Sequence, residues 1–165
     1  MMLLHRLTLP HQFRIIMRLE EAIQQENFKS EYQKAVVNIM YTYFSLKEKL
    51  SNRMSDYGIT LQQYNVLRIL KGQHPKGITT SDIRSRMLDK MSDASRLVDR
   101  LEKLKLVNKK INPDDRRLVI VTITEQGLEL LNKVQIEKGS IDELSASLNQ
   151  EEVTQLNVLL DKMRD

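Results

Sequence analysis

Apolar residues recur at helical spacing along most of the chain. In residues 31–54 they form one row and a second row beside it: Val36, Ile39, Tyr43, Leu46 and Leu50, then Val37, Met40 and Phe44. This pattern predicts a long helix whose apolar face is wider than packing on one neighbour requires. Near the other end, Asn149 and Glu152 form a capping signal. They predict a last helix with an apolar stripe at Val153, Leu156, Leu160 and Met163.

Two threonine-led capping boxes mark where shorter helices begin in the middle of the chain. Thr60 followed by Gln63 predicts a helix that ends at Gly72. Thr79 followed by Asp82 predicts a second, short helix. The buried side of this short helix is predicted to hold Ile83 and Met87.

The next segment changes from helical to strand spacing within a few residues. A helix is predicted over residues 92–105, with Leu97, Val98, Leu101 and Leu104 pointing inward. Strands are predicted over 107–111 and 118–123 from their β-branched content, joined by the loop Pro-Asp-Asp-Arg-Arg. Thr124 then caps a further helix that carries Leu128, Leu131 and Val134.

Positive charge is concentrated in this middle region. Residues 60–127 carry 14 Lys/Arg against 8 Asp/Glu, or +6, whereas residues 1–59 sum to +2 and residues 128–165 to −4. A local basic surplus favours a polyanionic partner. The alternative is a solvated surface that happens to be basic.

The amino-acid composition and the absence of known motifs exclude several kinds of functional site. The chain has no cysteine, which removes disulfides and thiolate ligands. It has no phosphate-loop, HExxH or GxSxG motif, and its three histidines are scattered. No apolar run approaches the ~20 residues of a membrane span. We therefore expect a cytoplasmic protein that is not an enzyme, with no cofactor, metal or membrane. Residues 1–16 are set apart as an N-terminal extension of uncertain origin, with Met17 as an alternative start.

The order of elements indicates a winged helix-turn-helix, mostly α with a small β-hairpin wing. The basic helix fits a DNA major groove, and the arginine-bearing hairpin tip reaches the neighbouring backbone or minor groove. Arginine suits such a tip because its flat guanidinium enters a narrow, electronegative groove. Asp115 is expected to hold Arg117 extended by a charge-assisted contact. The alternatives are a merely solvated tip and a dimeric winged-helix adaptor that binds protein rather than DNA.

The run SDASRLVDRLEKLKLV, followed by NPDDRRLVIVTITEQG, resembles the MarR family of bacterial transcription regulators. Asp115, Arg117, Thr124 and Gly127 match the family pattern of the wing and the helix after it. The resemblance covers roughly residues 31–165. The chain departs from the pattern at Lys105, where the family usually has the glycine that closes the recognition helix.

The resemblance implies a homodimer with intertwined terminal helices, acting on double-stranded DNA at a pseudo-palindromic operator. Residues 17–165 are then one domain, with dimerisation helices at 29–56 and 128–165 and a DNA-binding lobe at 57–127. The expected function is a sequence-specific transcriptional repressor. Family members commonly respond to a small lipophilic or phenolic ligand, and Tyr41, Tyr43, Tyr57 and Tyr64 lie near the expected cleft by position.

Candidate DNA-binding residues follow from position along the recognition helix and the wing. Ser92, Ser95 and Arg96, at the helix's amino end, are expected to meet base edges. Arg100 and Lys103 are expected to meet phosphates, with Arg84 and Arg86 as further backbone candidates. The wing contributes Asp115, Arg116 and Arg117. Asp93 and Asp99 on the same helix are expected to pair with neighbouring arginines or to accept from cytosine.

Overall fold

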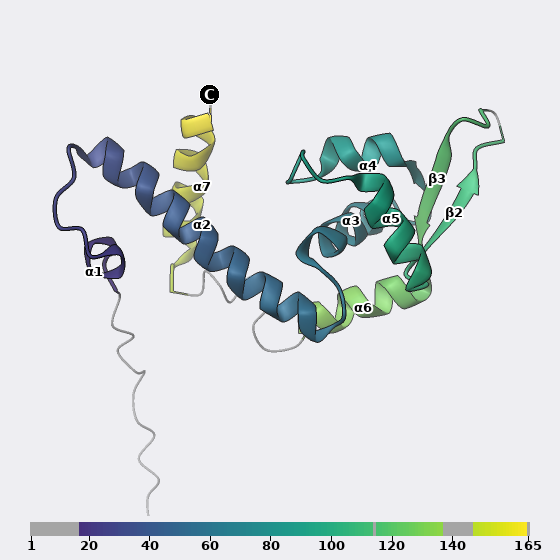
Figure 1. Cartoon of the computed structure of the whole chain (residues 1–165), viewed down its shortest axis with the longest axis horizontal. Coiled ribbons are helices and arrows are strands. Elements are labelled where there is room, and N and C mark those ends of the chain that lie inside the picture. Colours follow the sequence, from purple (N-terminus) through teal and green to yellow (C-terminus); the bar gives the residue numbers. More distant parts are fainter. Residues whose placement is uncertain (1–16, 114, 137–146, 165) are drawn as a thin grey trace, which may run out of the picture. The chain divides into compact units, whose positions relative to one another are not determined.

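A computed structural model describes residues 17–113, 115–136 and 147–164 (Figure 1). The chain divides into two compact units, one ending at Phe44 and the other beginning at Ser45. Residues 1–16, the predicted extension, lie outside the described residues. Within the described ranges, no helix is both long and apolar enough to cross a membrane.

The first unit holds α1 (Leu19–Ile23) and the amino-terminal part of α2 (Glu31–Asp56). A 2.6 Å ion pair between Glu20 Oε1 and Lys34 Nζ joins the two helices. The hydrogen bond from Lys34 is the main reason that the pKa of Glu20 lies below its ordinary value. The helix predicted over residues 31–54 is confirmed and ends two residues later.

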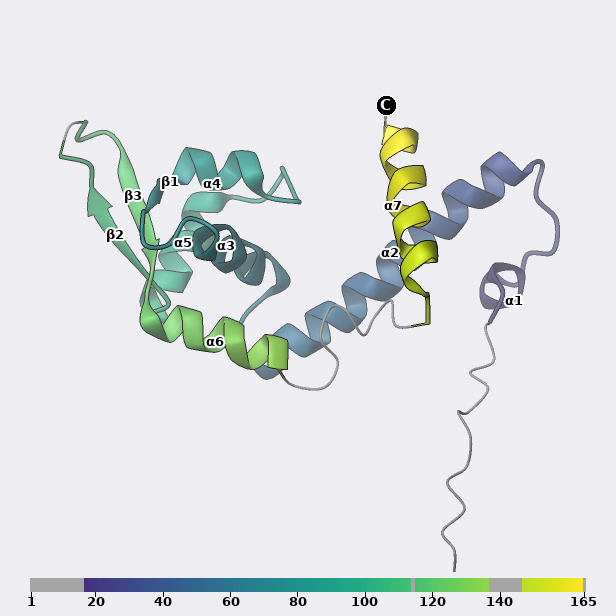
Figure 2. The same ribbon diagram turned by 180° about the vertical axis from the view of Figure 1, so that it is seen from behind.

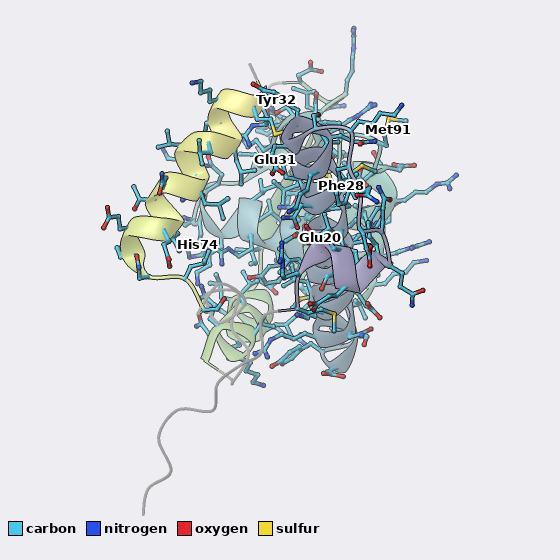
Figure 3. All side chains as sticks on the ribbon, turned by 90° about the vertical axis from the view of Figure 1, so that its left-hand side faces the viewer. Glu20, Phe28, Glu31, Tyr32, His74 and Met91 are labelled. Atoms are coloured by element: carbon cyan, nitrogen blue, oxygen red, sulfur yellow. The ribbon has the colours of Figure 1, made fainter. Side chains whose placement is uncertain are left out.

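The apolar face of α2 is largely uncovered within its own unit. Tyr32, at the amino end of the helix (Figure 3), is 87% exposed. The other exposed apolar side chains on this stretch are Val36, Ile39, Met40, Tyr41, Tyr43 and Phe44. A helix that leaves so much apolar surface in water is typical of an interaction face.

The second unit contains a lobe of four helices and three short strands, α3 (Leu61–Lys71), β1 (Ile78–Thr79), α4 (Thr80–Arg86), α5 (Ala94–Lys103), β2 (Val107–Ile111), β3 (Val119–Ile123) and α6 (Glu125–Ile136). Both predicted capping boxes are present. Thr60 Oγ1 accepts from the Gln63 backbone N–H, and Thr79 Oγ1 accepts from that of Asp82. In the second box the Thr79 hydroxyl is the main cause of the lowered pKa of Asp82.

The three strands form an antiparallel sheet in the order β1-β3-β2. Val107 pairs with Ile123 and Ile111 with Val119, so the two predicted strands form the hairpin, and β3 begins one residue later than predicted. Strand β1 was not predicted, because two residues are too short to display an alternating pattern. Gly77, just before it, has no room for a side chain, since a Cβ there would lie 2.8 Å from the Val121 carbonyl oxygen.

One apolar core ties these elements together. Its fully buried side chains come from the lobe's helices, from β2 and β3, and from the end of α2: Met54, Val66, Leu67, Leu70, Ile83, Met87, Val98, Leu101, Val107, Val121 and Leu131. α5 contacts α3, α4 and β2, so the candidate recognition helix is fixed on several sides. Figures 1 and 2 show the hairpin extending from the lobe with its tip on the side away from α6.

The helix predicted over residues 92–105 is shorter than expected at both ends. It begins at Ala94 and ends at Lys103, and Leu104, predicted to point inward, is 42% exposed. The helix stops because Lys105 takes a left-handed conformation with φ of 60°. The amide of Lys105 then donates to the Glu102 carbonyl and that of Leu106 to the Leu101 carbonyl. Leu106 is thereby buried in place of Leu104.

The helix after the wing begins as predicted. Thr124 Oγ1 accepts from the Gly127 backbone N–H at 3.1 Å and donates to the Lys105 carbonyl at 2.8 Å. A Cβ on Gly127 would collide with the Leu106 carbonyl oxygen. The Thr-x-x-Gly spacing therefore packs α6 against the turn that closes α5.

The last helix, α7 (Gln150–Arg164), is capped as predicted by Asn149 and Glu152. None of its residues is buried. Leu156, Val158, Leu159 and Met163 are exposed, and Val153 and Leu160 are half-buried. Like α2, this helix offers apolar surface that its own unit does not cover.

Candidate nucleic-acid interface

Asp93 shapes the amino end of α5. Its Oδ1 accepts from the Arg96 backbone N–H at 3.1 Å, which caps the helix. Its Oδ2 lies 3.2 Å from Nε of the same arginine. The predicted pairing of Asp93 with an arginine is confirmed. Because the Arg96 side chain remains 81% exposed, this weak surface pair leaves the guanidinium open to a partner.

Ser92 lies outside the helix, which corrects its predicted place within it. Its hydroxyl donates to Asp89 Oδ2 at 2.8 Å. That bond is the main cause of the lowered pKa of Asp89. Ser92 therefore orders the turn before α5, and Ser95 is the serine on the exposed first turn of the helix.

Two grooves meet at this end of α5. One, of about 560 Å³, runs between α4 and the start of α5 and is lined by Thr80, Ser81, Arg84, Met91, Ser92, Asp93, Ala94 and Ser95. The other, of about 260 Å³, is lined by Thr60, Gln62, Ser92, Asp93, Arg96, Leu97 and Arg100. The structure thus brings Ser92, Ser95, Arg96 and Arg100 together at one place on the surface. Lys103 is exposed one turn further along α5.

Asp99 and Glu102 are held by a lysine of the wing. Lys109 Nζ, from β2, lies 2.7 Å from Asp99 Oδ1 and 2.9 Å from Glu102 Oε2. The hydrogen bond from Lys109 is the main cause of the lowered pKa of Asp99, and the same contacts raise the pKa of Lys109. Of the two predicted alternatives for Asp99, pairing with an arginine is wrong, because its ion-pair partner is a lysine of the neighbouring strand, and the contact with cytosine stays a prediction.

The wing tip is closed by two hydrogen bonds that Asp115 accepts from backbone amides. Asp115 Oδ1 accepts from the Arg117 backbone N–H at 3.0 Å, and the Asp115 carbonyl accepts from the Leu118 amide at 2.9 Å. The predicted charge-assisted contact with the Arg117 guanidinium is therefore replaced by an Asx turn. Arg116 and Arg117 are both exposed. Asp115 fixes the turn and leaves both guanidinium groups facing solvent.

Sequence reasoning missed two contributors to this surface. Asp93 was missed as a helix cap because the helix was predicted to begin at residue 92, which places Asp93 inside it. Lys109 was missed because its contact joins residues ten apart across a helix and a strand, which no local spacing reveals. Among the described residues, no group of His, Asp or Glu side chains could hold a metal ion.

A basic helix supported by two others and followed by an arginine-tipped hairpin defines a winged helix-turn-helix protein. The family model described as "MarR family" matches residues 57–118. The HTH-type transcriptional regulator MhqR of Bacillus subtilis is 28% identical over 133 residues, which cover 79% of this chain and 89% of that protein.

Two solved structures extend the likeness over most of the chain. A MarR transcription factor from Planctomyces limnophilus is 31% identical, with a TM-score of 0.58, over 82% of this chain and 98% of that one. A mutant of MarR from E. coli, complexed with operator DNA, is 24% identical, with a TM-score of 0.68, over 84% and 99%. The chain belongs to the MarR family.

Proposed function

We propose that the chain is a homodimeric transcriptional regulator that binds double-stranded DNA in a sequence-specific manner. The observation that carries this proposal is the exposed basic edge of α5 beside a wing whose tip presents Arg116 and Arg117. Family relatives are transcription regulators, and the E. coli relative has been solved with operator DNA. Binding, not catalysis, is therefore the activity.

The proposed roles divide along the surface. Ser95 and Arg96, at the amino end of α5, read base edges in the major groove, and Ser92 supports the turn beside them. Arg100 and Lys103 contact phosphates, and Arg84 joins them from α4. The wing arginines reach the neighbouring backbone or minor groove, held there by the turn that Asp115 makes.

The exposed apolar faces of α2 and α7 support a homodimer. Two such protomers present two α5 helices, so operator half-sites lie about 10 base pairs apart, centre to centre, or a multiple of that. The domain plan is one domain over residues 17–165, with a lobe at 57–127 between dimerisation helices at 29–56 and 128–165. Repression, a cytoplasmic location and control by a small lipophilic or phenolic ligand complete the proposal. Tyr41 and Tyr43 are exposed candidates for that ligand, whereas Tyr64 is buried in the core.

Salt-dependent binding tests the proposal against a protein-binding adaptor. The purified protein selects fragments from a random duplex pool, and the recovered sequence is titrated at several salt concentrations. We expect a logarithmic salt slope of about −0.9 for each phosphate neutralised. Lys133→Ala serves as the control and should leave the slope unchanged, because this exposed lysine belongs to α6, which Figure 1 shows on the side of the lobe away from the wing tip. Failure to select any duplex, or binding that does not depend on salt, would contradict the proposal and favour a protein-binding adaptor.

A further inference from the structure

The candidate recognition helix carries two carboxylates, Asp99 and Glu102, next to the basic stripe formed by Arg96, Arg100 and Lys103. Asp99 lies about 40° around the helix from Lys103, since four residues turn ~400°. Glu102 follows on the same side, one turn along from Asp99. Both carboxylates are partly open to solvent, with side chains 56% and 42% exposed. Left alone, two negative charges beside this stripe would repel DNA phosphates.

Lys109 is placed to cancel part of this charge. It lies on the same face of β2 as the buried Val107, because alternate residues of a strand share a face. Its side chain is only 29% exposed and its ammonium contacts both carboxylates, at 2.7 and 2.9 Å. Lys110, the next residue, lies on the opposite face and is exposed.

We propose that Lys109 is a positioning residue that masks Asp99 and Glu102, lowering the repulsion between the recognition helix and DNA. This inference rests on the proposed DNA-binding function and extends it to a residue that makes no contact with the nucleic acid. The cluster of one lysine and two carboxylates carries a net charge of −1 in place of −2. It also ties the first strand of the wing to α5, so that helix and wing present one surface.

Masking predicts an effect that depends on the carboxylates. Lys109→Met in the otherwise natural chain should weaken binding to a selected duplex about five- to tenfold, because Asp99 and Glu102, no longer held by the ammonium, are then free to turn toward the phosphates. In a chain that already carries Asp99→Asn and Glu102→Gln, the same substitution should change affinity less than about twofold. Such non-additivity is the signature of groups that act through one another.

Matched variants separate this effect from a general loss of charge or of folding. Lys110→Met removes the same charge one residue away and should cost the same in both backgrounds. Lys109→Arg should bind the duplex as tightly as the natural chain does, because a guanidinium can bond both carboxylates. Thermal unfolding midpoints should stay close to that of the natural chain, because exposed ion pairs contribute only ~0–1 kcal/mol.

The outcomes are distinguishable. A loss confined to the natural background supports masking. An equal loss in both backgrounds, with the salt slope flattened by ~1, means that Lys109 contacts a phosphate directly and overturns the inference. Wild-type affinity for Lys109→Met in both backgrounds also overturns it, while the DNA-binding proposal stands. Failure of the natural chain to bind any duplex would overturn both the masking inference and the proposed DNA-binding function.

Discussion

The winged lobe buries its large apolar side chains, whereas the two helices that flank it in sequence, α2 and α7, leave many of theirs exposed. The lobe closes around one core, in which Leu67, Ile83 and Leu101 are fully buried. In α7 no residue is buried, and α2 leaves Tyr32 and Phe44 exposed. The lobe is therefore complete within one protomer, whereas the two helices carry apolar surface that the described residues of their own units leave exposed, as is typical of an interaction face. Changes in the two regions should consequently affect different measurements.

The largest expected effect is the loss of the dimer when residues 149–165 are deleted. Each leucine-sized side chain removed from water contributes about 1.5–3 kcal/mol. At full burial four such side chains contribute on the order of 6–12 kcal/mol before the cost of association, against the ~8 kcal/mol of a micromolar complex. Sedimentation at micromolar concentration should show a monomer. Deletion of residues 1–16 is the control and should leave both the dimer and DNA binding intact. A C-terminal truncation that stays dimeric would show that α7 is not part of the dimer interface.

A smaller effect, confined to the lobe, is expected from Gly127→Ala. The added methyl group meets the Leu106 carbonyl and lies 2.7 Å from Ile123 Cγ1. Overpacking of this kind costs about 1–3 kcal/mol of unfolding free energy. Gly72→Ala is the matched control, since φ is −66° and the nearest atom is 3.5 Å away. It should be neutral or stabilise slightly. Equal unfolding midpoints for the two variants would contradict the close packing of α6 on α5.

The smallest expected effect is a gain in stability from Lys105→Gly. α2 and α5 end in the same pattern of hydrogen bonds, but Gly58 closes the first, with φ of 71°, and Lys105 closes the second. A left-handed lysine costs about 1–2 kcal/mol of folding free energy. Replacing it with glycine removes that cost but adds about 0.5–1 kcal/mol, because glycine loses more backbone entropy on folding. Chemical denaturation should show a net gain of roughly 0.5–1 kcal/mol. Gly58→Lys should lower the unfolding free energy by a similar amount. A Lys105→Gly variant less stable than the natural chain would show that Lys105 is not strained.

Local patterns in the sequence were sufficient where the structure depends on near neighbours. Thr60 and Gln63 cap α3 as predicted, and the hairpin pairs as predicted, because capping boxes and strand alternation are short-range rules. The family match at Thr124 and Gly127 also has a physical reason, namely the close approach of α6 to the Leu106 carbonyl.

The same reasoning failed where a contact joins distant elements. Strand β1 exists because β3 offers it an edge, and Lys109 finds Asp99 only once β2 lies beside α5. Leu104 was placed inside because the helix was predicted to run two residues too far, as far as Lys105, which is left-handed in the structure. The roles of individual residues toward DNA remain predictions, and they can be tested one by one.

The most direct test of the winged DNA-binding lobe is a salt titration of Arg117→Ala on a selected operator and on a scrambled duplex. Arg96→Ala is its internal comparison. A wing arginine acts on phosphates and groove width, so Arg117→Ala should weaken binding to both duplexes and flatten the salt slope by ~1. Arg96→Ala should instead relax preference at one base pair per half-site, at a cost of ~1–3 kcal/mol. Arg117→Ala that binds both duplexes with wild-type affinity and slope would show that the hairpin is not a DNA-binding wing.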